Sequence, residues 1–349
     1  MPADVVSSPT GFQREKIILK LLMEIYTKIS ESIILPEVVF HDARFTSEDI
    51  VANYPGWTEV NHWVPLEGGE GLKSWVGMEH IWAAMERVGI GRGQTVAAVG
   101  GGTVTDAVGF AASTWKRGIP TVLMPTTLVG MVDAAHGGKT ALNFHGYKNI
   151  LGTHHPPQAV IVIPKWLETL PEQELRSGWF ELVKHALISS PQAWERIAAV
   201  HTPTLHAILP LIADSCAIKL DIVEQDPFES GLRKVLNFGH TVGHALEAWS
   251  HAKGTPIPHG ICVGQGMRWV LQWGSPELAL EIDPHLKRWL RAETPSAAAA
   301  EVWPWMVQDK KNSGREVREV VLDAVGAPRW DVPLTESEFL EAWEHGVGA

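Results

Sequence analysis

The sequence of 349 residues contains few cysteines, no long apolar run and no excess of positive charge. Cys216 and Cys262 have neither metal-binding nor redox spacing, which argues against a disulfide scaffold and indicates a reducing cytoplasm. No apolar segment reaches the ~18 residues of a membrane span, and the first residues, Met-Pro-Ala-Asp, lack the features of a secretion signal. The net charge of -11 argues against nucleic acid or a membrane surface as partner, because both favour a basic face. We therefore expect a soluble, cytoplasmic protein.

Two familiar site signatures are also missing. The metalloprotease pattern H-E-x-x-H is absent because Thr241 follows His240. The glycines at 100–102 do not complete the dinucleotide pattern G-x-G-x-x-G. Any metal or nucleotide site in this chain must therefore be formed by other residue patterns.

The hydrophobic pattern changes character along the chain. Short β-branched runs at 95–99, 121–124 and 159–163 alternate with helical segments such as 104–115, which is typical of a parallel α/β sheet. From Pro171 onward, apolar residues recur with the helical period over 171–189, 192–224, 233–251 and 259–273. We expect a Rossmann-like α/β domain at 1–157 and a mostly α-helical domain at 158–349, divided after the turn-rich segment 152–157.

Four polar side chains share one face of the predicted helix 233–251. Arg233, Asn237, His240 and His244 stand at i, i+4, i+7 and i+11, so this face is expected to meet a polar or metallic group. A catalytic Zn²⁺ takes about three nitrogen or oxygen ligands and keeps an open position. Candidates outside the stripe are Glu181, one helical turn before Lys184, and His259, in a loop bounded by proline and glycine. Either His240 or His244, or both, could complete the set.

A glycine-rich turn points to a phosphate. Gly100-Gly101-Gly102 stands between a predicted strand and a predicted helix that includes Asp106. Glycines let the backbone approach a phosphate, and the start of a helix offers free N–H groups and a positive dipole end. Upstream, Glu70 and Lys73 lie in a second glycine-containing loop, where a carboxylate can hold ribose hydroxyls.

Lysines flanked by glycines continue downstream. Lys139 follows Gly137-Gly138 and Lys148 follows Gly146-Tyr147, so we expect loops that wrap around an anion. Further cationic side chains outside these loops are Arg117, Lys184, Lys219, Arg233 and Lys310. Together they predict a substrate with more than one negative charge.

These segments resemble a known family, the sugar phosphate cyclases, and within it the 3-dehydroquinate synthases. The likeness runs from about Gly69 to Asn312. Its motifs, in order, are G-G-E-G-L-K, G-G-G-T-V-T-D, K-R-G-I-P, P-T-T-L, V-D-A-A-H-G-G-K-T, G-Y-K-N, E-L-R-S-G-W-F-E-L-V-K, G-L-R-K-V-L-N-F-G-H-T-V-G-H and D-K-K-N.

The resemblance implies an NAD-binding α/β domain, a helical domain and one Zn²⁺, with Co²⁺ as a second possibility, between them. It assigns the metal to Glu181, His240 and His259 and leaves His244 beside the metal or the substrate. The residues implied for NAD are Glu70, Lys73, Gly102, Asp106, Thr126, Thr127, Lys139, Lys148 and Thr169. Those implied for the substrate are Asp133, Lys139, Asn149, Lys184, Lys219, Arg233, Asn237, His244 and Lys310. Arg117 is expected to reach the phosphate bound by a neighbouring subunit of a homodimer.

The activity that follows from the resemblance is a step of aromatic amino acid biosynthesis through the shikimate pathway. A seven-carbon 3-deoxy sugar acid phosphate would be oxidised transiently by NAD, lose phosphate, be reduced again and close its ring by an aldol step. Lys139, Lys148, Asn149 and Arg117 would stabilise the charge that develops as phosphate leaves. Lys219, Arg233 and Asn237 fit a substrate with a carboxylate.

Some positions depart from the family pattern: Ala134-Ala135-His136 replaces a common run of small residues and Val, and Ile261 stands where Glu is common. The first ~60 residues also resemble the family poorly. The rival interpretations are a cyclase acting on a neutral sugar phosphate, a metal-dependent polyol dehydrogenase that releases NADH, and a catalytically silent NAD-binding regulator.

Overall fold

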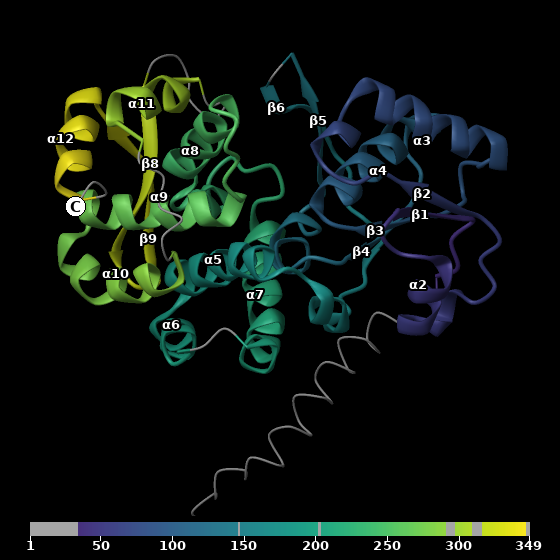
Figure 1. The fold of residues 1–349 in the computed structure, drawn as a ribbon, viewed down its shortest axis with the longest axis horizontal. Coiled ribbons are helices and arrows are strands. Elements are labelled where there is room, and N and C mark those ends of the chain that lie inside the picture. The colour runs from purple at the N-terminus through teal and green to yellow at the C-terminus, as the bar shows by residue number, and fades with distance from the viewer. Residues whose placement is uncertain (1–33, 146, 202–203, 291–296, 309–315, 347–349) are drawn as a thin grey trace, which may run out of the picture.

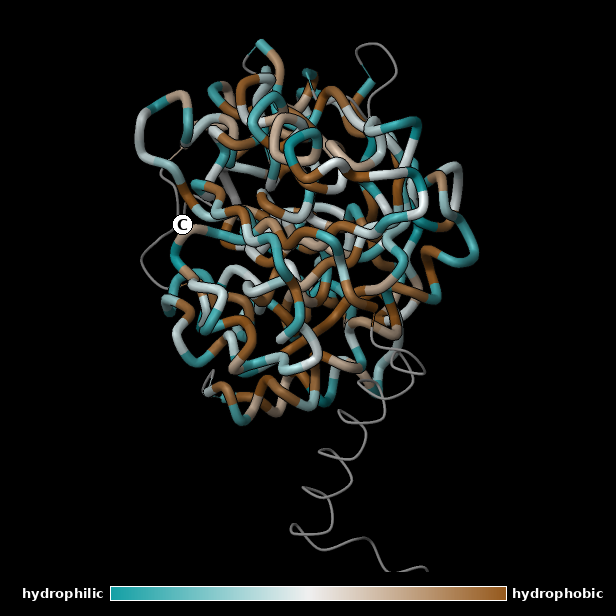
Figure 2. The backbone as a smooth tube through the Cα atoms, turned by 90° about the vertical axis from the view of Figure 1, so that its right-hand side faces the viewer, coloured by the Kyte–Doolittle hydropathy of each residue, from teal (hydrophilic) through white to brown (hydrophobic). Residues whose placement is uncertain are grey.

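The computed structural model describes residues 34–145, 147–201, 204–290, 297–308 and 316–346. Two lobes lie side by side (Figure 1): a sheet with its helices in the N-terminal half, and a mainly helical lobe in the C-terminal half. Hydrophobic stretches run through the middle of the molecule, while several of the outermost loops are hydrophilic (Figure 2). No helix in the described part of the chain is both long and apolar enough to cross a membrane.

The N-terminal lobe is built on a parallel sheet. Its strand order is β2 (Trp63–Leu66), β1 (Val38–Asp42), β3 (Val96–Gly100), β4 (Thr121–Pro125) and β7 (Ala159–Val160), and all four pairings are parallel. Every residue of β1, β3 and β4 is buried, as expected for strands covered on both faces. The predicted parallel α/β fold is therefore confirmed.

Alternate residues of strand β3 pack into two different hydrophobic cores. Val96 and Ala98 pack with helices α3 (Trp75–Val88) and α4 (Gly102–Thr114), while Ala97 and Val99 face a larger core shared with the helical lobe. The sheet is thus joined to the second lobe through apolar contacts. The predicted strand 159–163 is shorter in the structure: β7 ends at Val160, and Pro164 opens the 3-10 helix η5 (Pro164–Thr169).

The C-terminal lobe surrounds α5 (Glu172–Ser189). All thirteen residues from Arg176 to Ile188 are buried, so α5 has no solvent face over this stretch. The other described helices of the lobe are α6 (Pro191–Ala198), α7 (Leu205–Gln225), α8 (His240–Ala252), α9 (His259–Gly274), α10 (Pro276–Leu290), α11 (Ala299–Val307) and α12 (Glu336–Gly346). The lobe also contains an antiparallel hairpin, β8 (Val317–Ala324) with β9 (Ala327–Leu334), which the sequence did not lead us to expect.

Two of the predicted long helices are interrupted. The segment 192–224 divides into α6 and α7, where Thr204 caps α7 by accepting a hydrogen bond from Ala207 N–H. The prediction of a single helix over 233–251 is wrong. A 3-10 helix, η6 (Leu232–Asn237), precedes α8, and Gly239 lies between them. Gly239 has φ 73°, and a Cβ there would lie 2.5 Å from Met267 Cγ on α9. A side chain would block this close approach of two helices, and the helical period alone does not reveal it.

The segment expected to wrap an anion as loops forms a hairpin instead. Strand β5 (Lys139–Phe144) pairs with β6 (Tyr147–His154) in an antiparallel register that shifts between Leu142 and Phe144. The hairpin rises at the seam between the two lobes (Figure 1). The domain division after residue 157 stays a prediction, and β7 just beyond it pairs with β4 of the N-terminal sheet. The remaining elements are α2 (Ser47–Asn53) and the 3-10 turns η1 (Pro55–Trp57), η2 (Glu70–Leu72) and η3 (Trp115–Arg117), with the π-helical turn η4 (Gly130–Ala134).

Candidate active site

Glu181, His240 and His259 meet where three helices converge. Glu181 lies in the buried stretch of α5, and the two histidines are the first residues of α8 and α9. The Nε2 atoms of His240 and His259 lie 3.5 and 3.4 Å from Glu181 Oε1. His244, one turn along α8, is also close, with its ring centroid 5.3 Å from that of His240 and 5.6 Å from that of His259. His240, His244 and His259 each offer a ring nitrogen, and these nitrogens lie within 4.8 Å of one another, while Glu181 groups in the same way with Asp133 and His185. With Glu181 Oε1 facing His240 and His259, the arrangement suits a cation held by one carboxylate and two imidazoles.

The Glu181 carboxylate provides a test of that fit. It is fully buried, and neither of its oxygens has a partner in good hydrogen-bond geometry among the described residues. Lys184 Nζ forms an ion pair with Oε2 at 2.5 Å, whereas Oε1 faces the two imidazoles. A buried carboxylate oxygen without a good donor is costly, and a divalent cation among these three groups would satisfy it.

The two histidines differ in protonation. Burial lowers the pKa of His240 well below its usual value, and the charge of Lys184 lowers it further, so this imidazole is neutral and can accept a metal. Burial also lowers the pKa of His259, but the neighbouring Glu181 carboxylate and the hydrogen-bonded Glu247 carboxylate outweigh this and raise it to about 10. A metal binding to His259 would displace that proton.

Glu247 completes this cluster, and the sequence analysis missed it. Its Oε2 accepts a hydrogen bond from His259 Nδ1 at 2.9 Å, and its Oε1 accepts one from Lys148 Nζ at 2.7 Å. Burial raises the pKa of Glu247, but the bond to His259 and the charges of His259 and Lys148 outweigh it and lower the pKa. Glu247 stands seven residues after His240 on the same helix, a spacing that could have revealed it.

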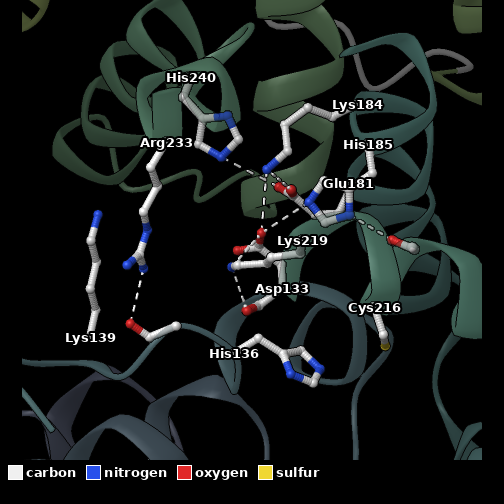
Figure 3. A network of polar contacts seen from close by, with 12 residues as sticks. Asp133, His136, Lys139, Glu181, Lys184, His185, Cys216, Lys219, Arg233 and His240 are labelled. Atoms are coloured by element: carbon white, nitrogen blue, oxygen red, sulfur yellow. Dashed lines mark hydrogen bonds and ion pairs between the residues drawn. The ribbon is translucent and has the colours of Figure 1, made fainter. Parts of the chain in front are cut away.

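A second cluster surrounds Asp133 of η4 (Figure 3). Lys219 Nζ lies 2.7 Å from Asp133 Oδ1 and also donates to the Asp133 carbonyl at 2.6 Å. Lys184 Nζ lies 3.4 Å from the same carboxylate, so Lys184 joins Asp133 to the Glu181 cluster. Burial raises the pKa of Asp133, but Lys184 and Lys219 outweigh it and hold the pKa well below its usual range. The predicted residues Asp133, Lys184 and Lys219 are thus brought together beside Glu181.

Two side chains that the sequence analysis did not select support Asp133. His185 Nε2 lies 3.4 Å from Asp133 Oδ1, and its Nδ1 is 2.6 Å from Ser215 Oγ on α7. Burial and the charge of Lys184 lower the pKa of His185, so this imidazole is neutral. His136 lies nearby and contacts the Met131 carbonyl at 2.7 Å; burial, then Lys219, lowers its pKa to about 4. His136 is therefore neutral and adds no positive charge beside Lys219.

The side chains of Arg233 and Asn237 donate hydrogen bonds to acceptors of the protein itself. Arg233 donates from Nη1 to the Pro227 carbonyl at 2.5 Å and from Nη2 to the Gly137 carbonyl at 3.1 Å. Asn237 Nδ2 donates to Glu229 Oε1 at 2.6 Å, and the other oxygen of Glu229 pairs with Lys139 Nζ. Glu229 therefore joins two residues that were predicted to bind substrate, and the sequence analysis missed it.

The predicted nucleotide residues meet at the carboxyl edge of the sheet. Gly102 opens α4 directly after β3, and Thr126, which follows β4, donates its N–H to the Gly100 carbonyl at 2.9 Å. Thr127 lies beside this turn, since a Cβ on Gly101 would be 3.2 Å from Thr127 Cγ2. The strand order reverses between β1 and β3, and Asp42 ends β1 there. Ligands of parallel α/β sheets bind at such a reversal.

Lys73 links this edge to the hairpin. Its buried Nζ lies 2.5 Å from Asp106 Oδ2 on α4 and 2.5 Å from Asn149 Oδ1 on β6. Glu70 accepts a hydrogen bond from Asn143 Nδ2 at 2.6 Å. Burial raises the pKa of Asp106, although Lys73 opposes the rise. The expected nucleotide residues Glu70, Lys73 and Asp106 therefore gather around one hairpin, together with Asn149.

Two predicted residues that the structure describes do not join these clusters, and a third lies outside the described residues. Thr169 ends η5, where its hydroxyl contacts the Trp166 carbonyl at 3.4 Å. Arg117 precedes β4 and so lies at the sheet edge opposite Gly102. Lys310 falls outside the described residues.

A cavity of about 900 Å³ in the described part of the chain is separate from the proposed metal site. Val160, Ile212, Cys216 and Val223 are among the mainly apolar side chains that line it, and none of the proposed metal ligands does. Cys216, half-buried on α7, and Cys262, buried on α9, lie on helices as expected, and burial raises the pKa of the Cys216 thiol to about 12.

Comparison with known proteins defines first the class of fold. The structure superposes on that of 2-epi-5-epi-valiolone synthase from Streptomyces hygroscopicus, solved with NAD⁺ and Zn²⁺ bound, with a TM-score of 0.81. That match has 24% sequence identity and covers 99% of this chain and 96% of the other. The chain therefore has the dehydroquinate synthase-like fold, a Rossmann-like lobe joined to a helical one.

Sequence comparison then gives the family. The model of the 3-dehydroquinate synthase N-terminal region matches residues 63–177, and that of the C-terminal region matches 178–312. A 3-dehydroquinate synthase of Parabacteroides distasonis is 37% identical over 79% of this chain and 81% of its own length. One of Corynebacterium jeikeium is 38% identical over 82% and 80%, respectively. The chain belongs to the 3-dehydroquinate synthase family.

Proposed function

We propose that this protein is a 3-dehydroquinate synthase. It converts 3-deoxy-D-arabino-heptulosonate 7-phosphate into 3-dehydroquinate and phosphate, as a phosphate-eliminating lyase that uses NAD catalytically. The observation that carries this proposal is the position of Glu181, which faces two histidines with one oxygen and Lys184 with the other. Through Lys184, the metal-ligand set adjoins the cationic cluster around Asp133. A hydroxyl oxidised at the metal would therefore lie beside groups that stabilise negative charge.

Glu181, His240 and His259 would hold the divalent cation, Zn²⁺ or Co²⁺, and His244, on the same side of α8, would face the substrate. The cation would supply a Lewis acid for a substrate hydroxyl, and NAD would supply the hydride acceptor. Lys184 and Lys219, paired through Asp133, stabilise the charge on oxygen that develops during oxidation and elimination. His185 and Ser215 hold the Asp133 carboxylate in place for this task.

Residues at the carboxyl edge of the sheet would hold NAD. The turn at Gly100–Gly102 and the start of α4 would receive the pyrophosphate, because helix N-termini offer N–H donors and a positive potential. Thr126, Thr127, Asp106, Lys73 and Glu70 surround that position. Lys148, which pairs with Glu247 of α8, would extend the cofactor site toward the helical lobe. Thr169 stays a prediction from the family resemblance.

The substrate's two anionic ends bind to different residues. Arg233, Asn237 and Lys219 receive the carboxylate, for which a guanidinium offers paired donors that an ammonium cannot copy. Lys139, Lys148, Asn149 and Lys310 receive the phosphate. Arg117, which lies away from the site of its own chain, completes the phosphate site of a partner subunit in a homodimer.

A phosphate-release assay tests the proposal. With trace NAD and excess seven-carbon acid phosphate, phosphate and carbocyclic product are expected in equal amounts over many turnovers, without net absorbance from NADH. If NADH accumulates in step with substrate loss, the protein is a dehydrogenase. Equal turnover of a sugar phosphate without the carboxylate would assign it to another cyclase.

A further inference from the structure

Glu247 connects a metal ligand of one lobe to the hairpin of the other. It lies on α8 with its side chain 15% exposed. One oxygen binds His259 Nδ1 at 2.9 Å, and the other binds Lys148 Nζ at 2.7 Å. Lys148 belongs to β6, 99 residues earlier in the sequence, and its Nζ also lies 3.1 Å from His251 Nε2 on α8.

We propose that Glu247 is a positioning residue: it orients His259 for the metal and, through Lys148, couples metal binding to the position of the β5–β6 hairpin. This inference rests on the proposed metal site. It adds a residue outside the ligand set and a link between metal occupancy and the part of the N-terminal lobe that holds Asn149.

The effect on His259 follows from the two nitrogens of its ring. Because Nδ1 donates its proton to Glu247, the lone pair used for a metal is on Nε2, the atom that faces Glu181 Oε1 at 3.4 Å. A carboxylate behind a ligating histidine fixes the tautomer and the ring plane, and its loss typically costs about 10- to 100-fold in metal affinity. Without Glu247, the His259 ring could rotate away from Glu181.

The effect on the hairpin follows from charge. Lys148 and Glu247 form an ion pair at the seam, with side-chain exposures of 33% and 15%, so solvent screens it less than a surface pair. Metal binding at His259 holds Glu247 in place, and Glu247 then holds Lys148. The same hairpin carries Asn149, which contacts Lys73 of the nucleotide edge. The metal and the nucleotide edge are thus joined through a short series of polar contacts.

Metal affinity provides the first test, with a readout separate from turnover. Zn²⁺ affinity is measured by competition with a chelator, and the visible absorption of Co²⁺ bound in place of Zn²⁺ reports ligand geometry. Glu247→Gln and Glu247→Ala are expected to weaken Zn²⁺ binding about 10- to 100-fold and to alter the Co²⁺ spectrum. Gln keeps the shape and one acceptor, so it remains informative if the Ala variant does not fold.

Glu301→Gln is the matched control. Glu301 pairs with Lys253, the residue directly after α8, but both side chains are exposed, 42% and 51%. Like Glu247→Gln, Glu301→Gln removes one negative charge close to α8, but it should leave Zn²⁺ affinity and the Co²⁺ spectrum unchanged. An equal loss of affinity in this control would mean that net charge, and not positioning, explains the result.

Hydrogen exchange tests the coupling to the hairpin. Zn²⁺ is expected to slow amide exchange at 139–144 and 148–154 in the unaltered protein, and much less in Glu247→Gln and Lys148→Met. Wild-type Zn²⁺ affinity in both Glu247 variants, with metal lost from His259→Ala, would overturn this inference and leave the proposed function intact. Stoichiometric zinc in His240→Ala and His259→Ala would instead reject the metal site itself. If Zn²⁺ still slows amide exchange at the hairpin in both Glu247→Gln and Lys148→Met, the coupling is refuted.

Discussion

The metal end and the anion end of the site are built differently. Glu181, His240 and His259 lie on three packed helices, and within the described part of the chain Oε1 of Glu181 faces the two imidazoles alone. At the anion end, Lys139, Asn237 and Arg233 come from a hairpin and a 3-10 turn, and they are engaged by Glu229 and by backbone carbonyls. The first end is arranged to receive a cation, whereas the second must exchange internal partners for a substrate.

Removing a metal ligand should have the largest effect. His240→Ala is expected to lose stoichiometric zinc and nearly all activity, because one of three ligands disappears. His244→Ala should keep the metal, since His244 is not in the proposed ligand set. Metal content by elemental analysis measures both variants. Full zinc retention in His240→Ala would contradict the assignment and remove the contrast between the two ends.

A substitution that shifts the backbone directly before the metal ligand His240 should have the next largest effect. Gly239→Ala places a Cβ 2.5 Å from Met267 Cγ at φ 73°, directly before His240. Strain and overpacking together predict a loss of about 2–5 kcal/mol in the free energy of unfolding. Chemical denaturation measures it. Gly254→Ala, at φ 75° with no atom within 4 Å of the new Cβ, is the matched control and should lose only about 1–2 kcal/mol.

At the anion end, a conservative change should alter substrate use and spare the fold. Arg233→Lys cannot reproduce the paired donors of a guanidinium, so kcat/KM for the acid substrate should fall roughly 10- to 100-fold, the worth of one or two charged hydrogen bonds. NAD affinity should remain close to that of the unaltered protein. An equal loss in NAD binding would show that Arg233 acts on the whole site and not on the carboxylate.

The smallest effect is expected from lowering the pH, which reduces stability by protonating the Asp226 carboxylate. Asp226 orders the turn before Arg233 by accepting hydrogen bonds from the N–H groups of Ser230, Gly231 and Arg233. Burial raises its pKa, but these donors outweigh it and lower the pKa to about 2. A carboxyl with a depressed folded pKa stabilises the fold above its unfolded pKa of about 4, and this stability is lost as pH falls toward 2.

Asp226→Asn should therefore flatten the change of Tm between about pH 4 and pH 2, while Tm near neutral pH falls slightly. Thermal melts across that range measure the difference. Identical acid limbs in the two proteins would show that Asp226 does not contribute to the pH dependence of stability.

Parts of this arrangement could be read from the sequence and parts could not. The parallel sheet, α4, α5 and α9 follow from apolar periodicity and glycine position, and the segments carrying Glu181 and His259 were placed correctly on or beside helices. The single helix over 233–251 was wrong because the break at Gly239 depends on the approach of α9, a contact between distant segments. The hairpin at 139–154 escaped notice because its glycines and lysines suggested a loop.

Residues that support other residues were the hardest to find. Glu247 and Glu229 pair with Lys148 and Lys139 of the distant hairpin, and His185 with Ser215 supports Asp133 of η4. These roles depend on contacts between separate segments, and among these four residues Glu247 alone had a local signal, its spacing from His240 on α8. The pairing of Asn149 with Lys73 likewise depends on the hairpin's position over α4. The roles of the site residues remain predictions that the experiments above address.

The complete burial of α5 also bears on how the molecule opens. A helix without a solvent face from Arg176 to Ile188 cannot fray on its own, so its amides should exchange only when the whole lobe unfolds. Glu181, Lys184 and His185 are all attached to that helix. Partial openings at the hairpin or the termini would then leave these three groups in register, and loss of the centre should coincide with global denaturation.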